Sequence, residues 1–406
     1  MNEDEPASSP TAKRALPRKL AWLIMPVVYV LLTMTVFWRL WTPVAGAERS
    51  WKYDPPHDYW GDLVFQEHTL GDGQIAMWNP HDRGGYPLYG DPQPGLLYPP
   101  NWPLLLWGSI GESLPFGIAS FKILLHWVFG AIGMHLLIRR FGAKEPACYT
   151  AGTLFAFTSP KLRYMGSALN WSVAWIPWVL LAVDWFAEKP DAKRGIVMGS
   201  ALAMVLLSGA PAVVLYTLIL ALPFGLYRMR GRLRANWKPI AIGAGVTLLW
   251  VLPLIASNLE QLPESVRQVR SYSFINDSVF SPGHLLSFLV PRLGQGENPY
   301  IGICAVLAIG LAIASKKHRG LAWLFMGVTA FSIAISFGSH AGILPALSSA
   351  VPPFSLFRRA HRYLYISSAA LAIISGIGIG YLVSVECKER KAELAKYLTW
   401  VGGALS

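Results

Sequence analysis

The strongest constraint in this sequence is a series of long apolar runs, separated by short polar connections, along the whole chain. A run of about 20 apolar residues suits a helix that crosses a bilayer, where only helices and closed barrels satisfy their backbone hydrogen bonds. The chain has 406 residues and only 14% are charged, whereas soluble domains carry roughly 25%. The sequence therefore predicts an all-α integral membrane protein, a polytopic bundle of about 10–11 transmembrane helices. The runs lie near 20–41, 117–138, 146–158, 171–187, 195–209, 211–227, 239–257, 299–315, 320–337 and 363–385.

Basic residues gather in every second connection between these runs. Because cytoplasmic loops of membrane proteins carry an excess of Lys and Arg, this pattern places the N-terminus in the cytoplasm. The net charge of +12 is then a signal of topology, and it predicts no binding to nucleic acid. The inner connections hold Arg139, Arg140, Lys144, Lys189, Lys193, Arg194, Arg228, Arg230, Arg232, Arg234, Lys238, Lys316, Lys317, Arg319, Lys388, Arg390, Lys391 and Lys396.

This topology divides the chain into four parts. They are a cytoplasmic tail (1–19), a first transmembrane helix (20–42), an extracytoplasmic loop (43–116) and a multi-helix transmembrane domain (117–406) with outer loops at 258–298 and 339–362. The final residues, YLTWVGGALS, read as the start of another helix. We therefore expect the chain to be a C-terminally truncated form of a longer protein.

The first outer loop differs in composition from the rest of the chain. It is rich in Gly, Pro, Trp and Tyr, which is typical of an ordered loop with tight turns, whereas a linker would have few aromatic residues. Such a loop can hold an active site. Between residues 54 and 101 it carries the acidic residues Asp54, Asp58, Asp62, Glu67, Asp72, Asp82 and Asp91.

Several arginines are exceptions to the positive-inside pattern. Arg358, Arg359 and Arg362 precede a helix that enters from outside, and Arg267 lies in another outer loop. One interpretation is that they reach lipid headgroups, as long basic side chains near helix ends do. The other is that they bind the phosphate of a lipid carrier, because guanidinium matches phosphate in a bidentate geometry. The nearby acidic loop favours the second, and Lys122 allows the same two interpretations.

Several segments together carry a resemblance to a known family. The loop sequence WNPHDRGGYPLYGDPQ (78–93), followed by YPPN (98–101), resembles the outer loop of the YfhO-like bacterial membrane proteins, which belong to the GT-C superfamily of glycosyltransferases. Further similar segments follow in the same order, among them HWVFGAIGMHLLIRRFG (126–142), WVLPLIASNLEQLPESVR (250–267) and FSLFRRAHRYLYI (354–366). The resemblance covers nearly the whole chain, although typical members continue with more helices.

The resemblance implies a GT-C-like fold with a large outer loop after helix 1, in a bacterial cytoplasmic (inner) membrane. It also implies transfer of a sugar from a polyprenyl-phosphate-linked donor. The acceptor would be an envelope polysaccharide, a glycolipid or a protein on the extracytoplasmic side. Enzymes of this superfamily use an acidic residue of the first outer loop, and a carboxylate can take the acceptor's proton as a general base. Positive side chains would stabilise the departing phosphate.

Three carboxylates are candidates for that base. Asp54 aligns with the first Asp of the family pattern and is our first choice. Asp58 is the second, with His57 beside it. Asp62 is the third, because GDLVFQEHTL (61–70) reads as a short amphipathic helix whose acids can simply face water.

Other loop residues have both a functional and a structural interpretation. Asp91 can orient sugar hydroxyls or cap a turn. Trp78 can stack on a sugar, or it can pack with Asn79 in a framework of turns. We predict Asp54 and Asp58 as catalytic residues, and as substrate-binding residues Asp62, Trp78, Asn79, Asp91, Gln93, Arg267, Arg358, Arg359 and Arg362.

No metal or cofactor is predicted. The acidic loop has no ligand spacing that specifies a divalent cation, and Cys148, Cys304 and Cys387 are too far apart in sequence to suggest a disulfide framework or a zinc site. Two other classes stay open. A transporter or flippase of a lipid-linked or polar solute would show paired ionisable residues and broken helices at mid-membrane. A non-catalytic scaffold would tolerate the loss of Asp54 and of the arginines.

Overall fold

The computed structural model describes residues 18–40, 59–82, 84–107, 113–261, 263, 272–276, 278–291, 299–384, 395–396 and 399–400. Within these ranges the chain is helical apart from turns and loops, and its one β-type pairing is the isolated bridge between Asn79 and Tyr86. The predicted all-α membrane architecture is confirmed.

Ten helices coincide with the ten predicted apolar runs. They are α1 (Arg18–Val36), α4 (Phe116–Arg140), α5 (Glu145–Ala156), α8 (Ile176–Glu188), α9 (Ala192–Leu207), α10 (Ala212–Met229), α11 (Trp237–Gln261), α13 (Ile303–Ala314), α14 (Arg319–Ser336) and α16 (Leu364–Leu382).

These helices differ in length. Six helical stretches of the described chain are long and apolar enough to cross a membrane, fewer than the 10–11 expected. The difference arises because four of the ten helices are too short by this measure: α5 and α13 have 12 residues each, α9 has 16, and the apolar part of α1 is Trp22–Val36. At 1.5 Å per residue, 12 residues give about 18 Å against a hydrocarbon core of about 30 Å. The six stretches are Phe116–Arg140, Ala168–Glu188, Ala212–Met229, Arg234–Gln261, Arg319–Ser336 and Ala360–Leu382.

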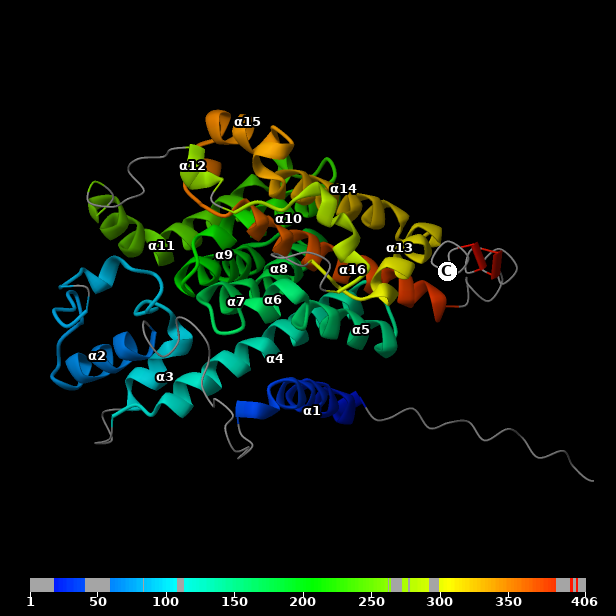
Figure 1. Cartoon of the computed structure of the whole chain (residues 1–406). Helices are drawn as coiled ribbons and strands as arrows, with labels where there is room; N and C mark the ends of the chain where they lie inside the picture. The colour runs from blue at the N-terminus through cyan, green and yellow to red at the C-terminus, as the bar shows by residue number, and fades with distance from the viewer. Residues whose placement is uncertain are drawn as a thin grey trace, which may run out of the picture.

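Helix α16 forms the centre of the bundle, packed against α5, α13 and α14 (Figure 1). It is apolar on all sides, as expected of a helix that is buried all round, and nearly all of its side chains are buried. Glycine allows its closest approach, since a Cβ at Gly378 would collide with the backbone carbonyl of Ala308. The GIGIG sequence at 376–380 therefore serves close helix packing.

Helix α11 packs on α9 through glycines. A Cβ at Gly199 would collide with the carbonyl of Gly243, so the two backbones touch. Few other side chains of α11 are buried, and Leu248, Leu249 and Leu252 are exposed. An exposed apolar face on a membrane helix is suited to contact with lipid.

Shorter elements connect the long helices. The α-helical ones are α2 (Trp60–Gly71), α3 (Trp102–Leu105), α6 (Ser159–Arg163), α7 (Ala168–Val173), α12 (Tyr272–Ile275) and α15 (Ile343–Ala350). The 3-10 helices are η1 (Trp38–Leu40), η3 (Leu88–Gly90), η4 (Pro99–Asn101), η6 (Arg234–Asn236), η9 (Pro282–Phe288), η10 (Gly338–His340), η11 (Pro352–Ser355) and η12 (Ala360–Tyr363).

The loop elements α2, η3, η4 and α3 gather at one end of the bundle, beside the start of α4 (Figure 1). We call this the loop end. Asn258 near the end of α11 donates its side-chain amide to the carbonyl of Gly90 in η3, which fixes the loop to the bundle. Helix α16 also begins toward this end, since Tyr365 donates to the carbonyl of Pro160 at the start of α6.

At the opposite end, where α4 and α8 finish, basic and acidic side chains form ion pairs. The buried carboxylate of Asp184 pairs with Arg140 and, at 2.6 Å, with Arg228. Glu188 pairs with Arg140 at 2.8 Å and with Arg194 at 3.3 Å. Arg140, Arg194 and Arg228 therefore have carboxylate partners within the protein.

Candidate functional site

Some of the predicted site residues lie outside the described residues, namely Asp54, Asp58 and Arg267. The described part of the loop begins at Tyr59, directly after Asp58. Tyr59 is buried, and its ring packs edge-on against Trp171 of α7 with 5.0 Å between the ring centroids. The chain that follows the two predicted catalytic residues is thus anchored in the bundle.

Asp62 is the buried carboxylate of helix α2, with 3% of its surface exposed. Tyr86 donates its hydroxyl to Oδ2 at 2.7 Å, and Asn79 donates its amide to Oδ1 at 3.0 Å. The predicted helix is confirmed, but the expectation that its acids face water is wrong for Asp62. The reason is that polar groups 17 and 24 residues further along the chain fold over it.

The surroundings of Asp62 change its acidity. Burial raises the pKa of Asp62 to about 6, because water no longer solvates the charged form. The hydrogen bonds from Tyr86 and Asn79 act in the opposite sense, and the charges of Asp91 and Asp82 raise the pKa further. A carboxyl group with such a pKa is suited to exchange a proton near neutral pH.

The segment after α2 is a framework of turns, as the sequence indicated. Asn79 and Tyr86 exchange two backbone hydrogen bonds of 2.9 Å, and the Asn79 side-chain oxygen accepts from the backbone of His81 at 3.0 Å. Gly85 has a φ of 98°, and a Cβ there would lie 2.9 Å from the ring of Trp78. Asn79 is thus fully engaged within the loop, while the ring of Trp78 packs on Gly85 and is still half exposed.

Asp91 caps a turn. Its Oδ1 accepts the backbone N–H of Gln93 at 2.9 Å, the arrangement expected for Asp before Pro. The structural interpretation of Asp91 is therefore confirmed. The side chain of Gln93 is half-buried in the same turn.

The arginine segment (358–362) leads into α16. Arg358 is exposed, and Arg359 has a φ of 70°, which no other described non-glycine residue shares. Backbone in this left-handed region is strained, and such strain is common at functional sites. The guanidinium of Arg362 lies 5.5 Å from the ring of Tyr164, and its Nε has no hydrogen-bond partner. Neither Arg358 nor Arg362 pairs with a carboxylate in the described part of the chain.

A chain of hydrogen bonds joins the loop to two helices. Trp175 donates to the Tyr98 hydroxyl at 2.7 Å, which lies 2.8 Å from Nε2 of His126, and Nδ1 of His126 lies 2.8 Å from the carbonyl of Lys122. A carbonyl only accepts, so Nδ1 of His126 carries the proton and Nε2 accepts from Tyr98. His126 thus has both ring nitrogens bonded inside the protein. His135 is also buried, with Nδ1 3.0 Å from the Tyr29 hydroxyl and Nε2 3.2 Å from the Glu145 carboxylate.

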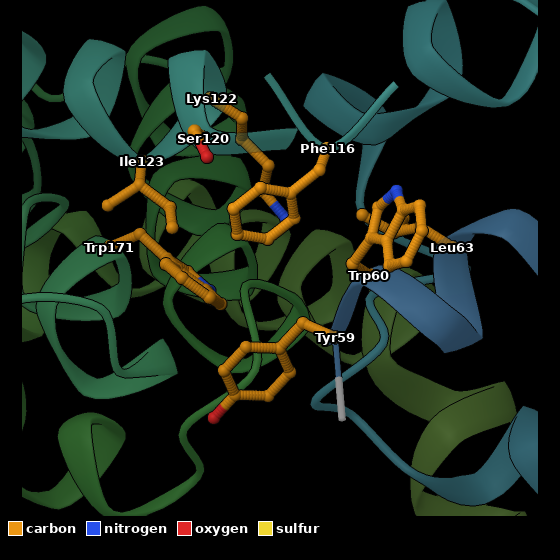
Figure 2. Close-up of a pocket in the computed structure, with 8 residues that line it drawn as sticks. All are labelled: Tyr59, Trp60, Leu63, Phe116, Ser120, Lys122, Ile123 and Trp171. Atoms are coloured by element: carbon orange, nitrogen blue, oxygen red, sulfur yellow. The ribbon is translucent and has the colours of Figure 1, made fainter. Parts of the chain in front are cut away.

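A pocket lies between the loop and the bundle at the loop end. Figure 2 shows that Lys122 extends between Phe116 and Trp171, and its Nζ lies 4.7 Å from the ring of Trp171. Lys122 is 7% exposed. It therefore does not reach the surface, and the interpretation that it extends to lipid headgroups is wrong. The lining residues are Tyr59, Trp60, Leu63, Phe116, Ser120, Lys122, Ile123 and Trp171.

A second buried lysine, Lys161 in α6, was missed by the sequence prediction. It is 2% exposed, and its Nζ has no hydrogen-bond partner. Aromatic rings surround it, with Trp127 at 4.7 Å and Phe155 at 4.6 Å. The signal was present in the sequence, because Lys161 and Arg163 lie in a connection predicted to be outside, like Arg358. No group of three or more potential metal ligands occurs among the described residues.

Comparisons with solved structures found two that resemble this chain. ArnT from Cupriavidus metallidurans bound to undecaprenyl phosphate is 17% identical, with a TM-score of 0.49, and covers 88% of this chain. The oligosaccharyltransferase AglB from Archaeoglobus fulgidus, in complex with an inhibitory peptide and a dolichol-phosphate, is 13% identical, with a TM-score of 0.44, and covers 94%. The chain spans 60% and 52% of their lengths, and similarity this weak establishes no shared function.

The sequence also matches a family model. No curated protein matches the chain. The model described as "6-pyruvoyl-tetrahydropterin synthase related domain; membrane protein" matches residues 116–401, from the start of α4 onward. The YfhO-like family suggested by the loop is not confirmed. Since the matched model covers well over half of the residues, the chain belongs to the family of membrane proteins with a 6-pyruvoyl-tetrahydropterin synthase related domain.

Proposed function

We propose that this protein is a membrane glycosyltransferase that transfers a sugar from a polyprenyl-phosphate-linked donor to an acceptor on the extracytoplasmic side. The observation that carries the proposal is the charge at the loop end. There, Lys161 and Arg362 have buried side-chain nitrogens without hydrogen-bond partners, and neither forms an ion pair with a carboxylate among the described residues, whereas at the opposite end Asp184 and Glu188 pair with arginines. A lipid-linked phosphate would supply the missing negative charge.

The reaction that fits these groups is a single displacement. The acceptor hydroxyl gives its proton to a loop carboxylate, and its oxygen forms a bond to the anomeric carbon of the sugar. The bond from that carbon to the phosphate oxygen breaks, and the polyprenyl phosphate leaves with its electron pair. One base and a group of cations are sufficient, whereas a retaining glycosidase needs a second carboxylate at a defined separation.

We assign the base to Asp54, with Asp58 as the alternative, on the resemblance of the loop to glycosyltransferase loops. Asp62 holds the loop in its conformation, because its hydrogen bonds to Asn79 and Tyr86 join α2 to the turns that follow. Its raised pKa of about 6 also makes it a candidate for proton transfer. Arg358, Arg359 and Arg362 are proposed to stabilise the departing phosphate, and the half-exposed Trp78 to contact the sugar.

The test is a transfer assay in membranes with a radiolabelled polyprenyl-phosphate sugar. Wild type should label an acceptor, and either Asp54→Asn or Asp58→Asn should reduce transfer at least about a hundredfold, since loss of a general base costs that much. Asp72→Asn, on an exposed residue of the same loop, is the matched control and should stay within about twofold of wild type. Absence of transfer by wild type from every polyprenyl donor would refute the proposal.

A flippase for a lipid-linked solute is the second candidate. The observation that favours it is the interrupted helix between α5 and α8, where the short helices α6 and α7 carry the buried Lys161. Broken helices and buried ionisable groups are common at transporter sites. Movement of a fluorescent isoprenoid-phosphate lipid across reconstituted vesicles without an acceptor would favour the flippase, and transfer without movement would favour the enzyme.

A further inference from the structure

Lys122 and Lys161 are buried cations that have no anionic partner among the described residues. Neither forms an ion pair in the described chain, and Lys161 Nζ has no hydrogen bond. Lysine is almost never fully buried unless it is paired, because removing an isolated ammonium from water is unfavourable. The contacts with the rings of Trp171, Trp127 and Phe155 compensate only part of this cost, because a cation–π contact is much weaker than the lost hydration of an ammonium.

The neighbours of Lys161 add further donors. Thr158 precedes Lys161 by three residues, at the N-terminus of α6. The ring of Trp127 lies 4.7 Å from Lys161 Nζ. The Oγ1 of Thr158 and the Nε1 of Trp127 are buried and have no hydrogen-bond partner. Buried donors in native proteins are nearly always satisfied. Three unsatisfied donors in one neighbourhood therefore point to a ligand that accepts hydrogen bonds and carries negative charge.

The two lysines are linked through helix α7. Asn170 donates its side-chain amide to the backbone carbonyl of Lys161 at 2.9 Å. The ring of the next residue, Trp171, lies 4.7 Å from Lys122 Nζ, and its centroid lies 6.4 Å from that of the His126 ring. His126 itself adds no compensating acceptor, because its two nitrogens bond to Tyr98 and to the backbone of Lys122. A single anion placed among these side chains would interact with both ammonium groups.

The surroundings favour an anion attached to a lipid. The pocket at Lys122 is lined mainly by aromatic and aliphatic side chains. On the same turns of α4, Phe121 and Leu125 are exposed, and exposed apolar side chains of a membrane helix contact hydrocarbon. An apolar chain can therefore lie along α4 while its polar group lies beside Lys122.

We infer that Lys122 and Lys161 form a second phosphate site, inside the bundle and separate from the arginine segment, that takes the phosphate group of an isoprenoid-type lipid. This inference rests on the proposed function. It adds to that function a second binding position, in which the phosphate of an isoprenoid lipid lies beside the two lysines of α4 and α6. The same chemistry could hold a free phosphate, which the experiment distinguishes.

The experiment measures equilibrium binding of radiolabelled farnesyl phosphate to the purified full chain in detergent. Farnesol, which lacks the phosphate, and inorganic pyrophosphate, which lacks the chain, are the competitors. Lys122→Met and Lys161→Met remove the charge and keep the length of the side chain, and Lys122→Arg restores a cation. Lys193→Met, on an exposed lysine at the opposite end of the bundle, is the matched control.

We expect each buried-lysine Met variant to bind farnesyl phosphate at least tenfold more weakly, since hydrogen bonds to charged groups are worth about a tenfold change or more. Lys122→Arg should recover most of the binding, and Lys193→Met should equal wild type. Without ligand, the Met variants should melt at the wild-type temperature or above it, because a buried unpaired charge has been removed.

Any one of four results would contradict the inference. Wild type could fail to bind farnesyl phosphate, or both Met variants could bind it like wild type. Pyrophosphate could compete as well as unlabelled farnesyl phosphate, which would exclude the lipid source. A lower melting temperature for ligand-free Lys161→Met would assign that residue a structural role instead. If lysine-dependent binding is found but no sugar is transferred, the phosphate site stands and only the transferase proposal fails.

Discussion

The two ends of the bundle hold basic residues in opposite ways. Where α4 and α8 finish, Arg140 and Arg228 share the buried carboxylate of Asp184. At the loop end, Lys161 and Arg362 have side-chain nitrogens without hydrogen-bond partners, and neither has a carboxylate partner in the described chain. The two ends therefore differ in the source of the negative charge that balances their buried basic residues. Arg140 and Arg228 of the paired end have their counter-charge within the protein, and we propose that an anionic ligand supplies it to Lys161 and Arg362 at the loop end.

The comparison also separates stability from function. A buried ion pair that loses one partner leaves an uncompensated charge and destabilises the fold. A buried cation without a partner is itself unfavourable, so its removal should not lower the stability. Cations of the paired end should therefore matter for folding, and cations of the loop end for binding. The predictions that follow test this separation, beginning with the largest effect.

The largest effect is expected at the paired end. Arg140→Met with Arg228→Met leaves Asp184, which is 1% exposed, without either of its cations. We expect the free energy of unfolding to fall by about 3–5 kcal/mol, measured by thermal denaturation in mild detergent. Lys144→Met at the same end is the control, since its ammonium bonds only to the backbone of Val383. An unchanged melting temperature in the double variant would remove the contrast between the two ends.

The next effect is expected at the loop end, on activity. Arg358→Gln with Arg362→Gln should reduce sugar transfer about a hundredfold, because fixed cations stabilise the charge of the departing phosphate. The melting temperature should change little, since neither arginine is ion-paired in the described chain. The readout is the initial rate of transfer per folded protein. A double variant that melts much earlier and keeps its specific activity would reverse the assignment.

Asp62 gives a smaller effect that depends on pH. Its folded-state pKa of about 6 lies above the ordinary value of 3.8, so the folded protein binds more protons than the unfolded chain between those values. Its contribution to stability is therefore greatest at low pH and falls as pH rises from about 4 to 6, by about 1–3 kcal/mol. Asp62→Asn should remove this slope. The measurement is the difference in melting temperature between wild type and variant from pH 4 to pH 7.

If Asp62 itself exchanges the acceptor's proton, the rate of transfer has the opposite trend. The ionised carboxylate is the base, so transfer should rise with pH through about 6. Asp62→Asn would then abolish transfer as well as the slope in stability. Retained transfer in that variant would leave the base at Asp54 or Asp58.

The smallest effect concerns the strained backbone at Arg359. Arg359→Gly should raise the free energy of unfolding by about 0.5–1 kcal/mol, because glycine adopts a φ of 70° without steric cost. The matched control is Arg358→Gly, which lacks a positive φ and should not stabilise the protein. Equal melting temperatures for the two variants would show that the strain has no consequence.

The positions of the long helices could be predicted from the sequence, but the side-chain contacts between distant segments could not. Each apolar run coincides with a helix because a bilayer leaves the backbone few alternatives. The burial of Asp62 was not predictable from the pattern of α2, because it depends on Asn79 and Tyr86, which reach it only after the turns fold back. The lengths of α5 and α13 were likewise not predictable, because the apolar runs do not show where each helix ends.

The candidate site was predicted in part. Charge on the wrong side of the membrane identified Arg358 and Arg362, and the same test would have identified Lys161. It could not show that Lys161 turns inward onto Trp127 and Phe155, since topology assigns a side of the membrane and not a depth. The roles of Asp54 and Asp58 remain predictions from the loop sequence, because both lie outside the described residues.

The hydrogen bond from Asn258 to Gly90 ties the loop to a helix that is largely exposed to lipid. Helix α11 has 25 residues, or about 37 Å at 1.5 Å per residue, and is longer than a hydrocarbon core of about 30 Å. A helix that is too long for its bilayer tilts. The thickness of the surrounding membrane therefore acts on the position of the loop, and vesicles of short-chain and long-chain lipids should give different rates of transfer at equal substrate concentration.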